Sequence, residues 1–243
     1  MASEVPSVAA QMPVERQTFA ERRIVVDQIE TLPYEARRQE LDRYYDAWAV
    51  NGCYDQDVTL GGYVAAVNLA NEMTEWFPDK TKRILDCASG TGLLGEELRK
   101  RGFTNLDSCD ASQGSLDFSK EKNIYRNFIC AVLGPERLPI EDDTYDGICL
   151  TGAFGRGHVQ PDCLPEWRRI TKPGGLLVFV VREKTLISAE GFCEGALDGL
   201  IHSEAGKGSW EFLLKKRIEY IQPTKDGRVA MAEYAFVYII RVL

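Results

Sequence analysis

Hydrophobic positions in the first third of the chain recur with helical spacing. Leu41, Tyr44, Tyr45 and Trp48 fall at i, i+3, i+4 and i+7 and form one apolar stripe between charged residues. This pattern predicts a helix over 34–50. The sequence also predicts helices over 14–30, on the other side of Pro33, and over 60–77.

From residue 83 the pattern becomes an alternation of short apolar runs and amphipathic stretches. The predicted strands are 83–87, 105–110, 125–132, 145–152 and 176–183, and the predicted helices between them are 92–102, 115–123 and 161–171. The sequence "KPGG" before the last strand is interpreted as a breaker. Near-continuous apolar strands that alternate with helices indicate a parallel sheet covered on both faces. We therefore predict a doubly wound, Rossmann-like α/β fold.

The C-terminal part has a different pattern. After a helical stretch near 190–204, two long β-rich runs, 212–224 and 229–243, are joined through "KDG". Such a connection predicts an antiparallel hairpin at the sheet edge, which would make a mostly parallel sheet of seven strands. We expect one domain over 1–243, with a helical lid (1–60), a ligand-binding core (61–182) and a substrate-side helix and hairpin (183–243).

Composition and charge narrow the possible partners. The net charge of −8 comes from 29 basic and 37 acidic residues, and the basic residues are scattered among the acids. Nucleic acid and anionic membrane are therefore not expected, and the apolar runs are shorter than the roughly 20 residues of a spanning helix. Seven cysteines without a C-x-x-C pair indicate reduced thiols and no metal site. We expect a monomer in the cytoplasm or nucleus, with no secretory leader.

A glycine-rich turn follows the strand at 83–87. Gly90, Gly92 and Gly95 have the G-x-G-x-x-G spacing that brings a ligand against free backbone N–H groups. Asp110 ends the next strand, 20 residues after Gly90, where a carboxylate can accept both ribose hydroxyls. Asp86, at the tip of the first strand, would repel a pyrophosphate and favour a cationic ligand such as S-adenosylmethionine. Capping of the helix or turn is the alternative role for Asp86.

Four motifs then occur in order: "ILDCASGTG", "CDAS", "LPIEDDTYDGICLTGAF" and "RRITKPGGLLVFVV". Over about residues 40 to 182 the chain resembles the class I S-adenosylmethionine-dependent methyltransferases. The segment "YYDAWAVNGCYDQDV", with the alanine of "LDCASGTGL", looks like the methyltransferase-like proteins of the Williams-Beuren syndrome critical region.

The resemblance implies S-adenosylmethionine as cofactor, S-adenosylhomocysteine as product and a small-molecule methyl acceptor that the sequence does not identify. It implies contacts to the methionine part of the cofactor from Asp86, Ala88, Ser89 and Gly90. Asp110 would bind the ribose, with Ala111 beside it, and Thr151 and Gly152 would face the transferable methyl group. The residues implied to cover the cofactor are Tyr45, Trp48 and Tyr54, although the two on the predicted 34–50 helix also fit an ordinary helix core.

Two positions depart from the superfamily pattern. Ala88 stands where glycine is usual, and its methyl group is tolerated there if φ is negative. Gly134 stands where relatives often carry an aspartate for the adenine amino group. Adenine would then rely on backbone groups and apolar contacts from Leu133.

Methyl transfer from a sulfonium needs mainly alignment and a dry site, and a base assists when the acceptor carries a proton. His158, beyond the strand at 145–152, is the candidate catalytic base, and an exposed loop histidine is the alternative. His202 is expected at the surface. Residues 202–212, with two glycines and Trp210, suggest a substrate lid. A non-catalytic cofactor-binding sensor and an NAD-dependent oxidoreductase remain the alternative functions.

Overall fold

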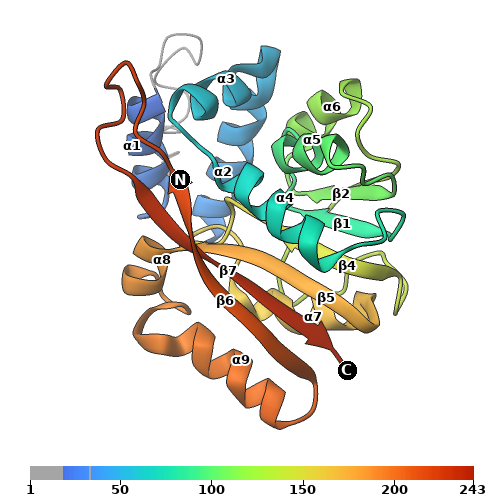
Figure 1. Cartoon of the computed structure of the whole chain (residues 1–243). Helices are drawn as coiled ribbons and strands as arrows, with labels where there is room; N and C mark the ends of the chain where they lie inside the picture. The colour runs from blue at the N-terminus through green and yellow to red at the C-terminus, as the bar shows by residue number, and fades with distance from the viewer. Residues whose placement is uncertain (1–18, 33) are drawn as a thin grey trace, which may run out of the picture.

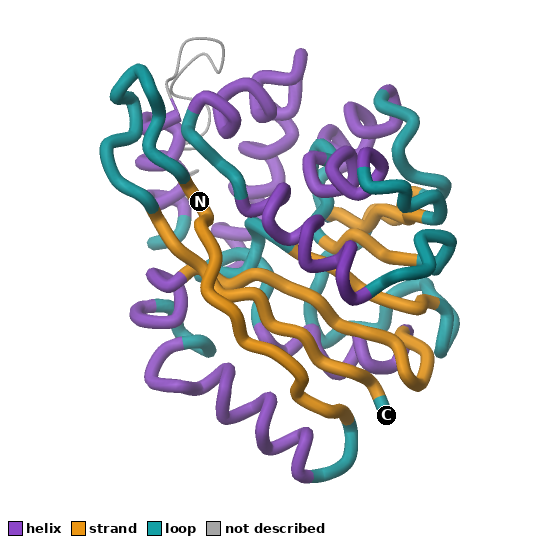
Figure 2. Tube along the Cα trace, in the orientation of Figure 1, coloured by secondary structure: helices purple, strands orange, loops and turns teal. Residues whose placement is uncertain are grey.

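A computed structural model describes residues 19–32 and 34–243. Its strands form one twisted sheet in the order β3-β2-β1-β4-β5-β7-β6, with helices on both faces (Figure 2). β1 to β5 pair in parallel, whereas β7 pairs antiparallel with β5 and β6. The strands are β1 (Ile84–Cys87), β2 (Leu106–Asp110), β3 (Phe128–Cys130), β4 (Tyr145–Leu150), β5 (Thr171–Arg182), β6 (Trp210–Ile221) and β7 (Glu233–Val242). The predicted fold and terminal hairpin are confirmed.

The helices are α1 (Phe19–Ile29), α2 (Tyr34–Ala49), α3 (Cys53–Leu60), α4 (Ala65–Trp76), α5 (Leu93–Lys100), α6 (Gln113–Glu121), α7 (Leu164–Ile170), α8 (Glu183–Ser188) and α9 (Ala196–Gly206). Short 3-10 turns, η3 (Val50–Gly52), η4 (Pro161–Cys163) and η5 (Cys193–Gly195), precede α3, α7 and α9. Figure 1 shows α1, α2 and α3 gathered on one side of the molecule, away from α9.

Two apolar clusters lie on opposite faces of the sheet because successive residues of a strand point to opposite sides. Leu177 and Phe179 of β5 join the cluster under α7 and α9, whereas Val178 and Val180 join the cluster under α4 and α5. A third cluster lies within the N-terminal helices and includes Trp48. Tyr63 and Leu93 pack against both this cluster and the cluster under α4 and α5, and so connect the N-terminal layer to the sheet core.

Carboxylates of the N-terminal helices attach that layer to the two ligand-side turns of the sheet. Asp46 of α2 accepts hydrogen bonds from Ser112 Oγ (2.6 Å) and from Gly114 N (3.0 Å) at the start of α6. Asp55 of α3 accepts a hydrogen bond from Thr91 Oγ1 in the glycine-rich turn. These contacts hold α2 and α3 over the ends of β1 and β2.

The structure corrects several predicted boundaries. Helix α3 lies in a segment for which no element was predicted. It ends at Leu60, where the next helix was expected to begin, and that helix begins at Ala65. The predicted breaker lies inside β5, because the strand continues through a register shift between Tyr145 and Gly147 of β4. A Cβ at Gly175 would lie 2.9 Å from the backbone oxygen of Asp146, so this close approach requires glycine.

The proposed lid at 202–212 is wrong. These residues form the end of α9 and the start of β6. Trp210 is 2% exposed, and its indole N–H donates to Ile201 O at 2.8 Å. His202 is exposed, as expected, and its Nδ1 lies 2.6 Å from Asp198 O. Trp210 is the one residue of this segment that is buried in the core.

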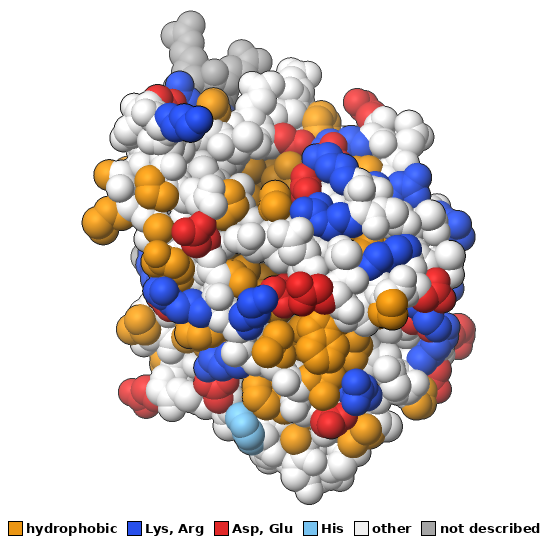
Figure 3. All heavy atoms as spheres, viewed as in Figure 1, with side chains coloured by type: hydrophobic (Ala, Val, Ile, Leu, Met, Phe, Trp, Pro, Cys, Tyr) orange, Lys and Arg blue, Asp and Glu red, His pale blue; other side chains and the backbone are white. Residues whose placement is uncertain are grey.

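The surface in Figure 3 carries basic and acidic side chains interspersed with apolar ones. In the described part of the chain, no helix has the length and apolar character needed to cross a bilayer.

All seven cysteines are free; four are buried, and Cys130 is exposed.

Candidate functional site

The glycine-rich turn connects β1 to α5 and leaves room for a ligand. Gly90 and Gly92 have positive φ values of +53° and +93°, which glycine adopts without steric cost. A Cβ added at Gly90 would have no atom within 4 Å. The turn therefore presents its backbone to open space at the start of a helix.

Asp110 connects this turn to the end of β2. Its Oδ2 accepts the Gly90 N–H and its Oδ1 accepts the Ser112 N–H, each at 2.8 Å. The pKa of Asp110 is raised overall, mainly by burial and also by the nearby carboxylates Asp42 and Asp46. The two backbone hydrogen bonds act in the opposite direction. Each carboxylate oxygen retains a lone pair, so Asp110 can still accept two hydroxyl groups from a ligand.

Ala88 is strained in the same turn. Its φ is +50°, which contradicts the expectation that a negative φ accommodates its methyl group. A left-handed conformation costs a non-glycine residue about 1 to 2 kcal/mol. The methyl group forms part of the cavity wall described below.

Asp86 lies beneath the turn. It is 1% exposed, and its Oδ2 accepts a hydrogen bond from Tyr125 Oη at 2.5 Å. Asp86 does not line the cavity described below, and its contact with the cofactor stays a prediction. The Tyr125 contact is neither a helix cap nor a hydrogen bond to the turn, which were the alternative roles for Asp86.

We expect the contribution of Asp86 to the stability of the protein to fall as the pH rises from about 4 to 7. Burial raises the pKa of Asp86 to about 7, whereas the hydrogen bond from Tyr125 lowers it. Between the unfolded value of about 3.9 and the folded value, the folded state binds a proton that the unfolded state has lost. The stabilisation by protonated Asp86 is complete below a pH of about 4 and is lost as the pH rises toward 7.

Asp86→Asn removes this titration and keeps an oxygen that accepts the Tyr125 hydroxyl. In urea unfolding, the free energy of unfolding at pH 7.5 minus that at pH 5 should be more positive in Asp86→Asn than in the wild type, by on the order of 1–3 kcal/mol. Asp117→Asn, an exposed change, should keep the wild-type difference. An Asp86→Asn protein with the full wild-type pH dependence would contradict the assignment.

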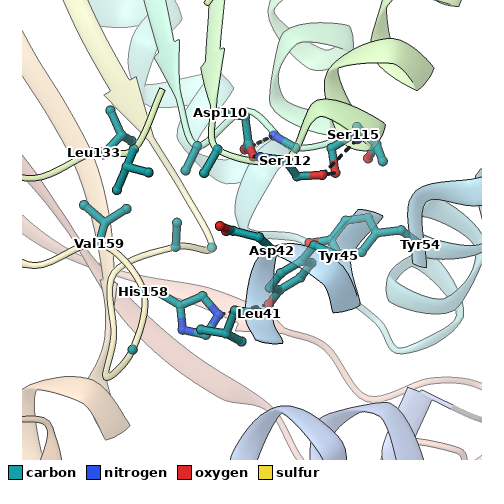
Figure 4. A pocket seen from close by; sticks show the side chains of 18 of the residues that line it. Leu41, Asp42, Tyr45, Tyr54, Asp110, Ser112, Ser115, Leu133, His158 and Val159 are labelled. Carbon is teal, nitrogen blue, oxygen red and sulfur yellow. Dashed lines mark hydrogen bonds between the residues drawn. The ribbon is translucent and has the colours of Figure 1, made fainter. Parts of the chain in front are cut away.

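A first cavity of about 160 Å³ lies above the glycine-rich turn. Figure 4 shows Asp42 and Tyr45 of α2 directed into it, across from Asp110. The residues that were singled out in the sequence and that line this cavity are Tyr45, Tyr54, Ala88, Gly90, Asp110, Ala111, Leu133, Thr151, Gly152 and His158. The structure therefore brings together ten of the fourteen candidate residues.

The other four candidates do not line the first cavity. Asp86 is buried, and Ser89 Oγ is 2.7 Å from Ser108 Oγ below the turn. Gly134 lies outside the cavity, next to Leu133. Trp48 lines a second cavity, and its Nε1 donates to Asp57 Oδ2 at 2.8 Å.

Nine residues that line the first cavity were not predicted from the sequence. Asp42 precedes Tyr45 by three positions, so helical spacing alone places both on one face of α2. The other missed lining residues are Leu41, Thr91, Ser112, Ser115, Val132, Ala153, Gly157 and Val159. Most lie in loops or at element ends, where spacing does not reveal side-chain direction.

The second cavity, of about 360 Å³, adjoins the first. Both are lined by Tyr45, Tyr54, Gly152, Ala153 and His158. The further lining residues include Trp48, Tyr63, Phe154 and Tyr220, with Asp27, Glu30, Arg156, Arg182 and Lys184 as charged groups. The second cavity thus has aromatic walls and charges of both signs.

Aromatic contacts fix the shared wall. The rings of Tyr45 and Trp48 stack with centroids 6.0 Å apart, and Tyr54 meets Trp48 edge-on at 4.9 Å. Tyr63 Oη is 3.1 Å from Thr151 Oγ1, beyond the end of β4. Burial raises the pKa of Tyr45, Tyr54 and Tyr63, so these phenols stay neutral at physiological pH.

Comparisons with known proteins identify the family. A family model described as a methyltransferase domain matches residues 85–179. Methyltransferase-like protein 27 of Homo sapiens is 34% identical over 174 residues, which cover 70% of this chain and 68% of the relative. The chain belongs to the class I S-adenosylmethionine-dependent methyltransferases. It is a methyltransferase, and its acceptor is not identified.

Further relatives and solved structures match different shares of this methyltransferase. Demethylmenaquinone methyltransferase of Beutenbergia cavernae is 34% identical over 99 residues, which cover 40% of the chain and 39% of the relative. A putative methyltransferase in complex with the Haloferax volcanii Trm112 activator has a TM-score of 0.58 at 18% identity, covering 82% of this chain and 97% of that one.

The fold alone does not define the reaction. The [4+2]-cyclase SpnF has a TM-score of 0.56 at 17% identity, covering 73% of this chain and 81% of its own. Its name describes a different chemistry on a similar fold. Family membership supports methyl transfer over the oxidoreductase alternative, and the acceptor must be inferred from the site.

Proposed function

We propose that this methyltransferase binds S-adenosylmethionine in the first cavity and transfers its methyl group to a small molecule in the second. The observation that carries this proposal is the junction of the two cavities at Tyr45, Tyr54, Gly152, Ala153 and His158. A methyl group held at this junction would be accessible from both sides.

The residues around the first cavity fit the cofactor. Gly90 leaves open space over the turn, and Asp110 keeps acceptor capacity for a ribose diol. Val132 and Leu133 offer apolar contact for adenine. Asp42 adds a second carboxylate to the cavity wall and favours a ligand of net positive charge.

When bound, S-adenosylmethionine supplies an activated methyl group on a sulfonium. The chain contributes alignment and exclusion of water. Tyr45 and Tyr54 cover the junction and can present ring faces to a cation. Thr151 lies at the junction end of β4, where its hydroxyl is held by Tyr63. Oriented reactants in such a site gain large effective concentrations.

The second cavity supports a small-molecule acceptor. Its volume of about 360 Å³ is larger than the 160 Å³ of the first cavity. Its walls are aromatic, and its charged groups include both acids and bases. A planar or partly apolar acceptor with a few polar groups fits this lining better than an extended polymer.

Calorimetry and label transfer test the proposal. S-adenosylhomocysteine should bind saturably at one site, whereas NADH should not bind. Incubation of the protein with methyl-labelled S-adenosylmethionine and a cell extract should place label in the low-molecular-weight fraction. Absence of S-adenosylhomocysteine binding, or label only in protein or nucleic acid, would contradict the proposal.

A further inference from the structure

His158 has both ring nitrogens engaged at the junction of the two cavities. Its Nε2 is 3.1 Å from Tyr45 Oη. Its Nδ1 is 3.2 Å from the backbone oxygen of Arg156 and 3.6 Å from Glu30 Oε1. The histidine is half-buried and not a solvated loop residue. His158 lines both cavities, and its Nε2 is already engaged by the Tyr45 hydroxyl.

These partners determine the tautomer. A backbone oxygen and a carboxylate only accept hydrogen bonds, so Nδ1 carries the proton of the neutral ring. Nε2 is then unprotonated and accepts the hydroxyl proton of Tyr45. Burial lowers the pKa of His158, which keeps the ring neutral at physiological pH. The hydrogen bonds thus run from Tyr45 through His158 to the Arg156 backbone oxygen, with the Glu30 carboxylate beside Nδ1.

We propose that Tyr45 and His158 form a proton relay beside the Glu30 carboxylate and that the methyl acceptor is a hydroxyl or amine that loses its proton through this relay. This inference rests on the proposed function. Tyr45 lines both cavities, and its oxygen keeps a lone pair that can accept a hydrogen bond from the acceptor. Tyr45 is the residue that touches the acceptor, whereas Glu30 is a positioning residue.

The transfer balances in atoms and electrons. A lone pair on the acceptor oxygen or nitrogen forms the new bond to the methyl carbon, and the carbon–sulfur bond breaks with its electron pair left on sulfur. The acceptor proton moves to Tyr45 Oη while the Tyr45 proton moves to His158 Nε2. The sulfonium becomes a neutral thioether, and the positive charge ends on the imidazolium.

The Glu30 carboxylate stabilises the positive charge of the imidazolium. This carboxylate, at the end of α1, is the acid nearest to Nδ1, with Asp27 of the same helix also lining the second cavity. Arg37 of α2 and Arg182 at the end of β5 act against protonation of His158, and Arg156 and Lys184 also surround Glu30. With several cations nearby, removal of the Glu30 charge should make the imidazolium harder to form.

The first experiment measures the His158 pKa by NMR in the complex with S-adenosylhomocysteine. The chain has only two histidines, so His202→Gln assigns the signals. Glu30→Gln should lower the His158 pKa because it removes the charge that favours the imidazolium. Tyr45→Phe should raise it because it removes the donor that favours neutral Nε2. Glu121→Gln, an exposed change at the end of α6, should leave it unchanged.

The second experiment tests the acceptor class with phenol and toluene as probes. Both are titrated into the complex with S-adenosylhomocysteine. The ratio of phenol affinity to toluene affinity should fall about tenfold in Tyr45→Phe, because the phenol hydroxyl loses its acceptor. Glu121→Gln should keep the wild-type ratio.

The outcomes separate the two proposals. Loss of S-adenosylhomocysteine binding in the wild type would refute the proposed function. Normal S-adenosylhomocysteine binding with an unchanged His158 pKa in Glu30→Gln, or with an unchanged phenol-to-toluene ratio in Tyr45→Phe, would overturn the relay and leave the proposed function standing. Retained S-adenosylhomocysteine binding also shows that each variant is folded.

Discussion

Asp110→Asn is expected to weaken S-adenosylhomocysteine binding by about 100-fold or more. The Asp110 carboxylate accepts one backbone N–H on each oxygen, from Gly90 and from Ser112. An asparagine side chain has one oxygen, so its NH₂ group would face one of these donors. The turn would lose a hydrogen bond, and the ribose would lose a charged acceptor.

The magnitude follows from hydrogen bonds to a charged group. Each is worth about 1.5–3 kcal/mol, so the loss of two costs about 3 kcal/mol or more, and 1.4 kcal/mol corresponds to tenfold in affinity. Calorimetry with S-adenosylhomocysteine measures the effect. Asp117→Asn is the control, because Asp117 is exposed on α6 and pairs only with nearby side chains. Binding of Asp110→Asn within about threefold of the control would remove Asp110 from the cofactor site.

The sequence predicted the sheet and its order of elements because both depend on short-range patterns. Near-continuous apolar strands alternate with helices, and the spacing from Gly90 to Asp110 is fixed by one strand–helix–strand unit. The Gly90–Asp110 hydrogen bond follows from that unit. The first cavity was predictable to the same extent, since it lies where β1, β2 and β4 end.

Contacts between distant segments were not predictable in the same way. The hydrogen-bond donor to the buried Asp86 carboxyl group is Tyr125, which is 39 positions away in the sequence and reaches under the turn. Similarly, Trp210 lies beside two glycines and was assigned to a mobile lid, but it is buried under α9. Polar residues and glycines near a side chain in the sequence do not reveal which distant element covers it in the fold.

The two cavities show the same limit within the site. Helical spacing correctly predicted that Tyr45 and Trp48 share an apolar stripe, yet only the structure separates their positions. Tyr45 contacts both cavities, whereas Trp48 lines only the second and is held by Asp57. The His158–Tyr45 contact joins residues 113 positions apart. The proton relay therefore follows from the tertiary structure.

Gly95→Ala is expected to destabilise the protein by about 3 kcal/mol, although alanine is the better helix former. Gly95 lies inside α5, and a Cβ there would lie 2.3 Å from Tyr125 Oη and 2.5 Å from its Cζ. Tyr125 is buried and donates to Asp86, so it has little freedom to move aside. The added methyl group would displace the hydroxyl and leave the Asp86 carboxyl group without this donor.

The opposing effects can be compared. Overpacking costs about 1–3 kcal/mol, and a buried polar group that loses its partner costs about 1–3 kcal/mol. The gain in helix propensity is only about 1 kcal/mol. Gly199→Ala is the matched control, because Gly199 is exposed inside α9 and a Cβ there would have no atom within 4 Å.

Urea unfolding at pH 7 should therefore show opposite signs for the two glycine-to-alanine changes. Gly199→Ala should stabilise the protein by up to about 1 kcal/mol, since only helix propensity changes. If Gly95→Ala were as stable as Gly199→Ala, the Tyr125–Asp86 contact would not constrain the turn. Opposite signs would show that the third glycine of the motif serves the packing of Tyr125 beneath the turn, while Gly90 leaves the space above it open for the ligand.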